Sequence, residues 1–121
     1  MKPIRIVAAE VGGASDFTAR LVAQGISGPL GESVIVENRG GTGVIAGQTV
    51  AKAAPDGYTL LLTSSGHASL PAVMKSLPYD AVKDFAPVTL AARSVGFVLV
   101  VHPSVPARSV KELITLAKQR P

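Results

Sequence analysis

Cysteine and tryptophan are absent from this sequence, and its aromatic residues amount to two tyrosines and three phenylalanines. Without cysteine the chain can form no disulfide scaffold, no Cys-ligated zinc site and no thiol nucleophile. The longest unbroken apolar run, at residues 97–101, is far shorter than the ~18 residues that a membrane-spanning helix needs. At 121 residues the chain is nevertheless long enough for one domain with a hydrophobic core. The sequence therefore predicts a single domain that does not span a membrane.

Excess positive charge is confined to the second half of the chain. Residues 1–60 carry five Lys or Arg and five Asp or Glu, whereas residues 61–121 carry seven and three, which gives the net charge of +4. The last cations alternate with apolar residues at helical spacing, as on the solvated face of a helix. Nucleic-acid-binding surfaces usually add aromatic or Arg-rich readers to such charge, and aromatic residues are few here. We therefore expect no nucleic-acid partner.

Residues that could ligate a metal or catalyse a reaction are also few. The two histidines, His67 and His102, lie far apart in the sequence, and no cluster of carboxylates accompanies them. His67 follows two serines, but sequence neighbours seldom have the geometry of a nucleophilic Ser–His pair, and no G-x-S-x-G elbow surrounds them. The G-x-x-x-x-G-K-[ST] motif of a P-loop is missing. We expect no metal, no cofactor and no catalysis.

Short apolar runs rich in β-branched residues recur along the first half of the chain, at residues 4–7, 34–36 and 58–62. Segments between them read as helices, and this alternation indicates βαβ units in a parallel sheet. The first helix is expected to have Ser15 as its N-cap and to stop at Gly28-Pro29. A second helix is expected at residues 44–54. The predicted fold class is α/β.

Two further strands are predicted in the second half of the chain, at residues 87–91 and 96–101. The final helix opens with the capping box S-x-x-E at Ser109. Its buried side is expected to consist of Leu113, Leu116 and Ala117. The chain then stops at Pro121, where a further strand would be expected, so we interpret it as an incomplete fragment. No leader segment follows Met1, so either the protein is cytosolic or a leader has been removed.

Two polar loops are candidate binding elements, because each joins a predicted strand to a helix. The loop V-G-G-A-S-D occupies residues 11–16, and the loop T-S-S-G-H occupies residues 63–67. Glycines let the backbone approach a ligand, and a helix N-terminus offers free N–H groups that favour a carboxylate, phosphate or sulfate. The carboxyl ends of parallel strands share one edge, so we expect the two loops to meet there. Such a rim of donors predicts binding rather than turnover.

A third turn, at residues 40–47, keeps an alternative open. Gly41, Gly43 and Ala46 give it the G-x-G-x-x-A shape of a dinucleotide-binding fingerprint. That fingerprint expects an acidic residue at the end of the next strand, where this chain has Thr63-Ser64. A ligand-facing turn of another kind is the better interpretation, and we expect this turn at the same edge of the sheet as the two loops. The alternative function is an α/β nucleotide-binding or hydrolytic enzyme domain that uses the Gly40–Gly47 turn.

The chain is also similar, over nearly its whole length, to a known family. The shared segments occur in the family's order: K-P-I-R-I-V at 2–7, G-G-A-S-D at 12–16, V-I-V-E-N-R-G-G-T-G at 34–43, A-P-D-G-Y-T-L-L-L at 54–62, L-P-Y-D at 77–80, K-D-F-A-P-V at 83–88, V-H-P-S at 101–104 and S-V-K-E-L at 109–113. In these segments the sequence resembles the Bug, or TctC-type, family. Its members are extracytoplasmic solute receptors of tripartite tricarboxylate transporters.

The resemblance implies a two-lobed periplasmic-binding-protein fold of type II-like organisation, with a mainly parallel sheet in each lobe and the ligand between the lobes. This chain would be an incomplete lobe. Residues 1–92 would form the first βαβαβ segment of lobe I, and residues 93–108 the crossing strand or hinge region. Residues 109–121 would form the first helix of lobe II, which is truncated.

The resemblance also implies a function. The ligand would be a small organic acid or an acidic amino acid, bound through main-chain N–H groups and ordered waters. The protein would be periplasmic, with its leader removed, and would pass its ligand to the membrane components of a tripartite transporter. An exposed lobe interface would also permit self-association.

The resemblance carries the ligand-binding role to both loops. The expected ligand-binding residues are Gly12, Gly13, Ala14, Ser15, Asp16, Thr63, Ser64, Ser65, Gly66 and His67. Asp16 is expected to tie down its loop or to receive a ligand amine. One departure from the family is Glu10, which stands where an apolar residue is common. A carboxylate there would repel an acidic ligand unless it points away or meets a ligand amine.

Overall fold

The computed structural model describes residues 2–93, 96 and 98–119. Within them a parallel sheet is formed by β1 (Ile4–Ala8), β2 (Val34–Asn38) and β3 (Thr59–Leu61). The strand order is β2-β1-β3, so β1 is central. The predictions of an α/β fold and of these three strands are confirmed, with boundaries shifted by one or two residues.

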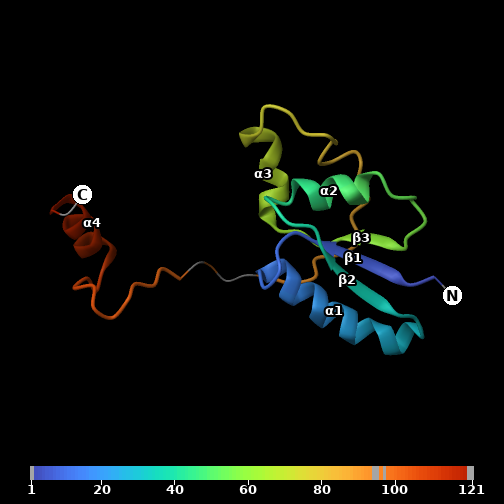
Figure 1. The fold of residues 1–121 in the computed structure, drawn as a ribbon, viewed down its shortest axis with the longest axis horizontal. Coiled ribbons are helices and arrows are strands. Elements are labelled where there is room, and N and C mark those ends of the chain that lie inside the picture. The colour runs from blue at the N-terminus through green and yellow to red at the C-terminus, as the bar shows by residue number, and fades with distance from the viewer. Residues whose placement is uncertain (1, 94–95, 97, 120–121) are drawn as a thin grey trace.

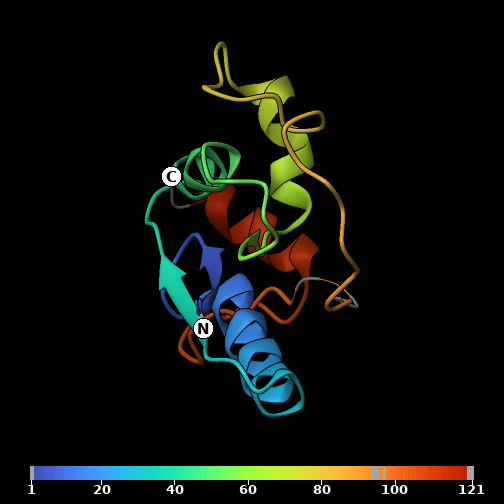
Figure 2. The same ribbon diagram turned by 90° about the vertical axis from the view of Figure 1, so that its right-hand side faces the viewer.

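Helices lie on both faces of the sheet (Figure 1). On one face α1 (Ala14–Leu30) packs on β1 and β2, and on the other α2 (Val44–Ala51) packs on β1 and β3. The helix α3 (Ser65–Val73) lies at the opposite end of the molecule from α1 (Figure 2). The last helix, α4 (Val110–Gln119), lies apart from the sheet. At the carboxyl ends of the neighbouring strands β1 and β3 the chain therefore leaves toward two different helices, α1 and α3.

The core is centred on β1, whose two faces are both covered. Ile6, Val7 and Ala8 are each at most 2% exposed. Ile6 and Ala8 pack against Ala19 and Ala23 of α1, whose small side chains allow the helix to approach the sheet closely. A strand buried on both faces is typical of a doubly wound parallel sheet. This core fixes the carboxyl end of β1, where the first candidate loop begins.

The boundaries of α1 differ from those predicted. The N-cap is Gly13, not Ser15, because Asp16 stands at the third helical position and its side chain binds the N–H of Gly12. The helix also continues through Pro29 and ends at Leu30, and its C-cap Gly31 adopts a left-handed conformation (φ 64°). Pro29 lacks the N–H that a helical residue donates, and α1 ends one residue after it.

The second helix ends three residues earlier than predicted, at Ala51, with Lys52 as its C-cap. In α4 the predicted capping bond is present, since the Glu112 N–H donates to Ser109 Oγ at 3.2 Å. The expected buried side of α4 is wrong: Leu113 and Leu116 are half-buried, and Ala117 is exposed. Nothing in the described chain covers this helix. No described helix is long and apolar enough to cross a membrane.

The two later strands were predicted wrongly. Residues 87–91 form no strand, and neither do residues 96 and 98–101; Phe97 lies outside the described residues. Their apolar side chains are largely exposed, for example 79% for Leu90 and 86% for Val98. A strand requires a neighbour with which to exchange backbone hydrogen bonds, and the described chain offers these segments none.

Candidate functional site

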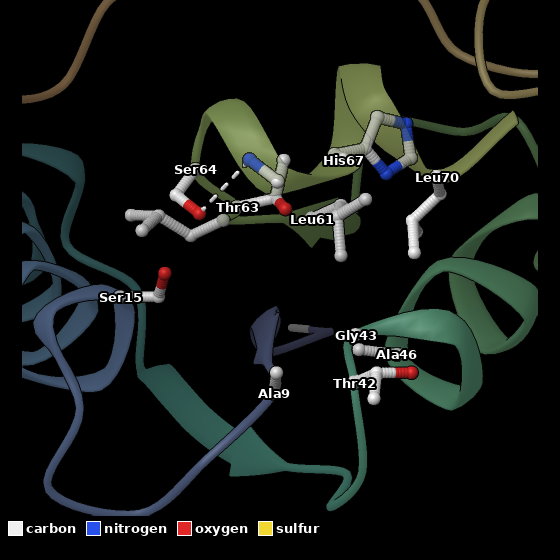
Figure 3. A pocket seen from close by; sticks show the side chains of 12 residues that line it. Ala9, Ser15, Thr42, Gly43, Ala46, Leu61, Thr63, Ser64, His67 and Leu70 are labelled. Atoms are coloured by element: carbon white, nitrogen blue, oxygen red, sulfur yellow. Dashed lines mark hydrogen bonds between the residues drawn. The ribbon is translucent and has the colours of Figure 1, made fainter. Parts of the chain in front are cut away.

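A cavity of about 70 Å³ opens at the carboxyl ends of β1 and β3, where the helical connections diverge (Figure 3). In open α/β sheets this is the place where ligands bind. Among the described residues, no Asp, Glu, Lys or Arg lines it. The lining residues are Ala9, Ser15, Thr42, Gly43, Ala46, Leu61, Leu62, Thr63, Ser64, Gly66, His67 and Leu70.

The N-termini of three helices border this cavity. Figure 3 shows Ser15 of α1, Gly43 before α2 and Ser64 before α3 on different sides of it. The first N–H groups of a helix lack an intrahelical acceptor and lie at the positive end of its dipole. As far as the chain is described, the first-turn N–H groups of α1 and α2 donate to no protein acceptor. Helix N-termini of this kind are where anionic oxygens commonly bind in proteins.

The loop between β1 and α1 is held by Asp16, which is 4% exposed. Its Oδ2 accepts the N–H of Gly12 at 2.9 Å. Its Oδ1 accepts from Asn38 Nδ2 and from an Arg20 guanidinium nitrogen, both at 3.0 Å. Asp16 therefore ties down its loop, and the N–H of Gly12 is engaged within the protein.

These donors stabilise the charged form of Asp16. The Gly12 N–H contributes most, followed by Arg20 and Asn38, and together they lower the pKa of Asp16 to about 2. Partial desolvation acts in the opposite direction and is outweighed. The carboxylate is thus a permanent part of the loop at neutral pH.

The loop between β3 and α3 is shorter than predicted, because Ser65 is already helical and Ser64 is the N-cap. The Ser64 Oγ accepts the Gly66 N–H at 3.4 Å, which is a long bond. His67 points its Nε2 at the carbonyl oxygen of Ala81, at 3.0 Å. A carbonyl can only accept, so Nε2 carries the proton and is engaged there rather than with a serine.

Aromatic packing holds His67 in place. Its ring is stacked on Tyr79 with centroids 5.9 Å apart, and Phe85 meets it edge-on at 5.0 Å. Tyr79 in turn lies on α2 at Gly47, where an added Cβ would come within 2.6 Å of the Tyr79 Cζ. This cluster links α2 to α3 and so fixes the position of the start of α3 beside the cavity.

The structure brings together half of the expected ligand-binding residues. Ser15, Thr63, Ser64, Gly66 and His67 line the cavity. The others lie behind it or beside it and are not among the lining residues: Gly12, Gly13, Ala14, Asp16 and Ser65. The side chain of Glu10 is exposed and does not line the cavity either, while its backbone carbonyl accepts from Asn38 at 3.3 Å.

The third glycine-rich turn was expected at this edge of the sheet, but its residues were not among the expected ligand-binding residues. Thr42, Gly43 and Ala46 line the same cavity as the two predicted loops. Gly43 has a φ of 87°, a left-handed conformation that favours glycine and begins α2. The strand-to-helix position of the turn was a usable signal, because all three such turns follow parallel strands.

A second hollow, of about 410 Å³, lies beside the end of α3 and is lined by residues between Pro71 and Ala81. It gathers none of the expected ligand-binding residues. It also lies away from the carboxyl ends of the strands. We therefore place the candidate site at the smaller cavity.

Known proteins are similar to this chain in sequence and in fold. The protein BugT of Bordetella pertussis is 42% identical in an alignment of 127 residues that covers 99% of this chain and 38% of BugT. The solved periplasmic binding protein BugD is 39% identical, with a TM-score of 0.67 over 71% of this chain and 29% of BugD. The R. palustris protein Rpa4515, solved with adipate, is 34% identical, with a TM-score of 0.82 over all of this chain and 41% of Rpa4515.

The chain thus spans well under half the length of these relatives, while matching them over most or all of its own length. Residues 18–121 match the family described as the tripartite tricarboxylate transporter family receptor, TctC. The α/β lobe described above is accordingly part of a periplasmic-binding-protein fold. The chain belongs to the TctC family of tripartite tricarboxylate transporter receptors.

Proposed function

We propose that this chain contributes one side of the binding site of a periplasmic receptor for a small organic carboxylate. The observation that carries the proposal is the cavity bordered by three helix N-termini at the carboxyl ends of β1 and β3, with no carboxylate, lysine or arginine among its described lining residues. Oriented N–H dipoles favour a carboxylate there without a cationic side chain. The relative solved with adipate, a dicarboxylate, supports this ligand class.

The carboxylate would be gripped by the main chain at the starts of α1, α2 and α3, with the hydroxyls of Ser15, Thr63 and Ser64 as further donors. A cavity of about 70 Å³ accommodates one carboxylate end. Whole-ligand pockets are larger, typically ~300–1,000 Å³. The remainder of the acid, or of an acidic amino acid, would therefore contact a part of the protein other than this lobe.

That further part would be a second lobe. We assign residues 1–92 to the first lobe, 93–108 to the crossing segment and 109–121 to the start of the second lobe. Two observations support this division: α4 lies apart from the sheet, and residues 98–108 between them form no strand or helix. Closure of two lobes around the acid would exclude water and complete its contacts.

The same assignment gives the receptor its partners. It would act outside the cytoplasmic membrane and deliver the acid to the membrane components of a tripartite transporter, in keeping with the family to which the chain belongs. The exposed apolar side chains of residues 98–101 would cause self-association when nothing covers them. We expect this association in the isolated 121-residue chain.

The proposal is tested by heating the complete gene product with a panel of mono- and dicarboxylates and acidic amino acids. The matched controls are the neutral amides of the same acids. An acid present at 100 times its Kd stabilises its receptor by about 2.7 kcal/mol, so the thermal midpoint should rise by several degrees, and the amide should have no effect.

Three results would contradict the proposal. One is a thermal midpoint that no acid moves at millimolar concentration. The other two favour the enzyme alternative: stabilisation by nucleotides alone, and ester hydrolysis that His67→Ala abolishes. The position of Gly43 and Ala46 at the cavity makes the nucleotide arm a necessary control.

A further inference from the structure

Asn38, the last residue of β2, makes three hydrogen bonds that bring two other segments together. Its Nδ2 donates to Asp16 Oδ1 at 3.0 Å and to the carbonyl oxygen of Glu10 at 3.3 Å. Its Oδ1 accepts from the Arg20 guanidinium at 3.1 Å. One side chain therefore connects the end of β2, the β1–α1 loop and the first turns of α1.

Only an amide fits this position. Both partners of Nδ2 are acceptors, and the partner of Oδ1 is a donor, so an aspartate would place a carboxylate against Asp16, and a leucine would bond to none of the three. The amide is also fixed by its strand, because Asn38 is paired with Ala8 in the sheet. A rigid strand therefore positions the loop through a side chain that the resemblance did not single out.

We propose that Asn38 is a positioning residue for the ligand site: through Asp16 and the Glu10 carbonyl it holds the β1–α1 loop so that the N–H groups at the start of α1 face the cavity. Asn38 does not line the cavity itself. Its effect on a ligand would pass through Asp16 to Gly12 and from there to Ser15. This inference rests on the proposed carboxylate site and adds one residue to its supporting structure.

The first test is made without ligand, on the amide of Gly12 in the complete gene product. Hydrogen exchange of the Gly12 N–H should be about tenfold faster in Asn38→Ala, because its acceptor Asp16 loses one of two side-chain donors. The exchange rates of the β1 amides should change only as much as the overall loss of stability requires. Arg20→Ala removes the other donor from an exposed position, so it should fold normally and show a smaller change in the same direction.

The second test measures affinity for the acid that stabilises the wild-type protein most. Asn38→Ala should weaken binding about tenfold. The matched control is Glu37→Gln, one residue earlier on the same strand, which breaks the pair with Arg5 (2.7 Å) and does not touch the loop. At equal loss of stability the control should bind the acid as tightly as the wild type does.

The outcomes separate this inference from the proposed function. If Gly12 exchanges at the wild-type rate in both Asn38→Ala and Arg20→Ala, Asn38 does not position the loop, whatever the ligand. If exchange accelerates but Glu37→Gln weakens binding as much as Asn38→Ala, the loss is general destabilisation and the inference fails. If no acid binds the wild type, the proposed function fails, and the exchange measurement alone decides whether Asn38 holds the loop.

Discussion

The two predicted loops border one cavity, yet they are held by different kinds of interaction. The β1–α1 loop depends on a charged carboxylate, Asp16, and its three donors. The β3–α3 loop depends on ring packing of His67 with Tyr79 and Phe85 and on a long cap bond of 3.4 Å. The first loop is therefore sensitive to pH and to single donors, and the second is sensitive to volume.

This difference suits the task of each loop in the proposed site. Hydrogen bonds to a carboxylate are directional and fix where the N–H of Gly12 points, and with it the chain that leads into α1. Aromatic packing sets the distance between α2 and α3 without fixing any one amide. One loop would orient donors, while the other would set the width of the cavity. Perturbing each in turn should separate the two roles.

The largest effect is expected from Gly47→Ala, which disturbs the aromatic side. The new Cβ would lie 2.6 Å from Tyr79 Cζ, and the ring cannot move away freely because it is packed against His67 and Phe85. Overpacking of this kind costs about 1–3 kcal/mol. Urea unfolding of the complete gene product measures it. The control is Gly25→Ala in α1, which meets no atom within 4 Å and should gain about 0.5–1 kcal/mol. Equal effects at both positions would contradict the packing account.

A smaller effect is expected from Asp16→Asn, largest near neutral pH and shrinking in acid. The pKa of Asp16 is lowered from 3.8 to about 2 in the folded state, so its contribution is complete above about pH 5 and is lost as the pH falls through 2. The wild type should therefore lose stability over this range more steeply than Asp16→Asn does. Glu37, Asp56 and Asp80 also have lowered pKa values, so some slope should remain in the variant. Identical slopes in the two proteins would mean that Asp16 is not bound as described.

Local signals in the sequence were enough to predict the three strands of the sheet, β1, β2 and β3, and the positions of the two loops. Runs such as Val34–Val36 are short, β-branched and bounded by turn residues, which specifies a strand wherever a parallel neighbour exists. The same signals failed at residues 87–91, because strand formation there depends on a neighbour that the described chain does not contain. Strand propensity is a local property, whereas pairing is not.

Only half of the expected ligand-binding residues line the cavity, for a related reason. Ser15 and Thr63 could be placed from their loops, because parallel strands end at one edge of the sheet. The tie between Asp16 and Asn38 joins residues 22 positions apart and depends on the register of β2 against β1. No spacing rule in the sequence encodes that distance.

The smallest effect is expected from Tyr79→Phe, which tests whether the aromatic side depends on volume alone. The Tyr79 hydroxyl is buried and has no hydrogen-bond partner among the described residues, and this burial raises the pKa of the phenol. A buried hydroxyl without a partner contributes a desolvation cost and no bond, so its removal should leave stability unchanged or raise it by up to about 1 kcal/mol. Ring packing on His67 and Phe85 is preserved in the variant, so carboxylate affinity should also stay at the wild-type value. Urea unfolding and a ligand titration measure the two quantities. A clear loss of stability would show that the hydroxyl has a partner, and the β3–α3 loop would then be held by polar contacts, as the β1–α1 loop is.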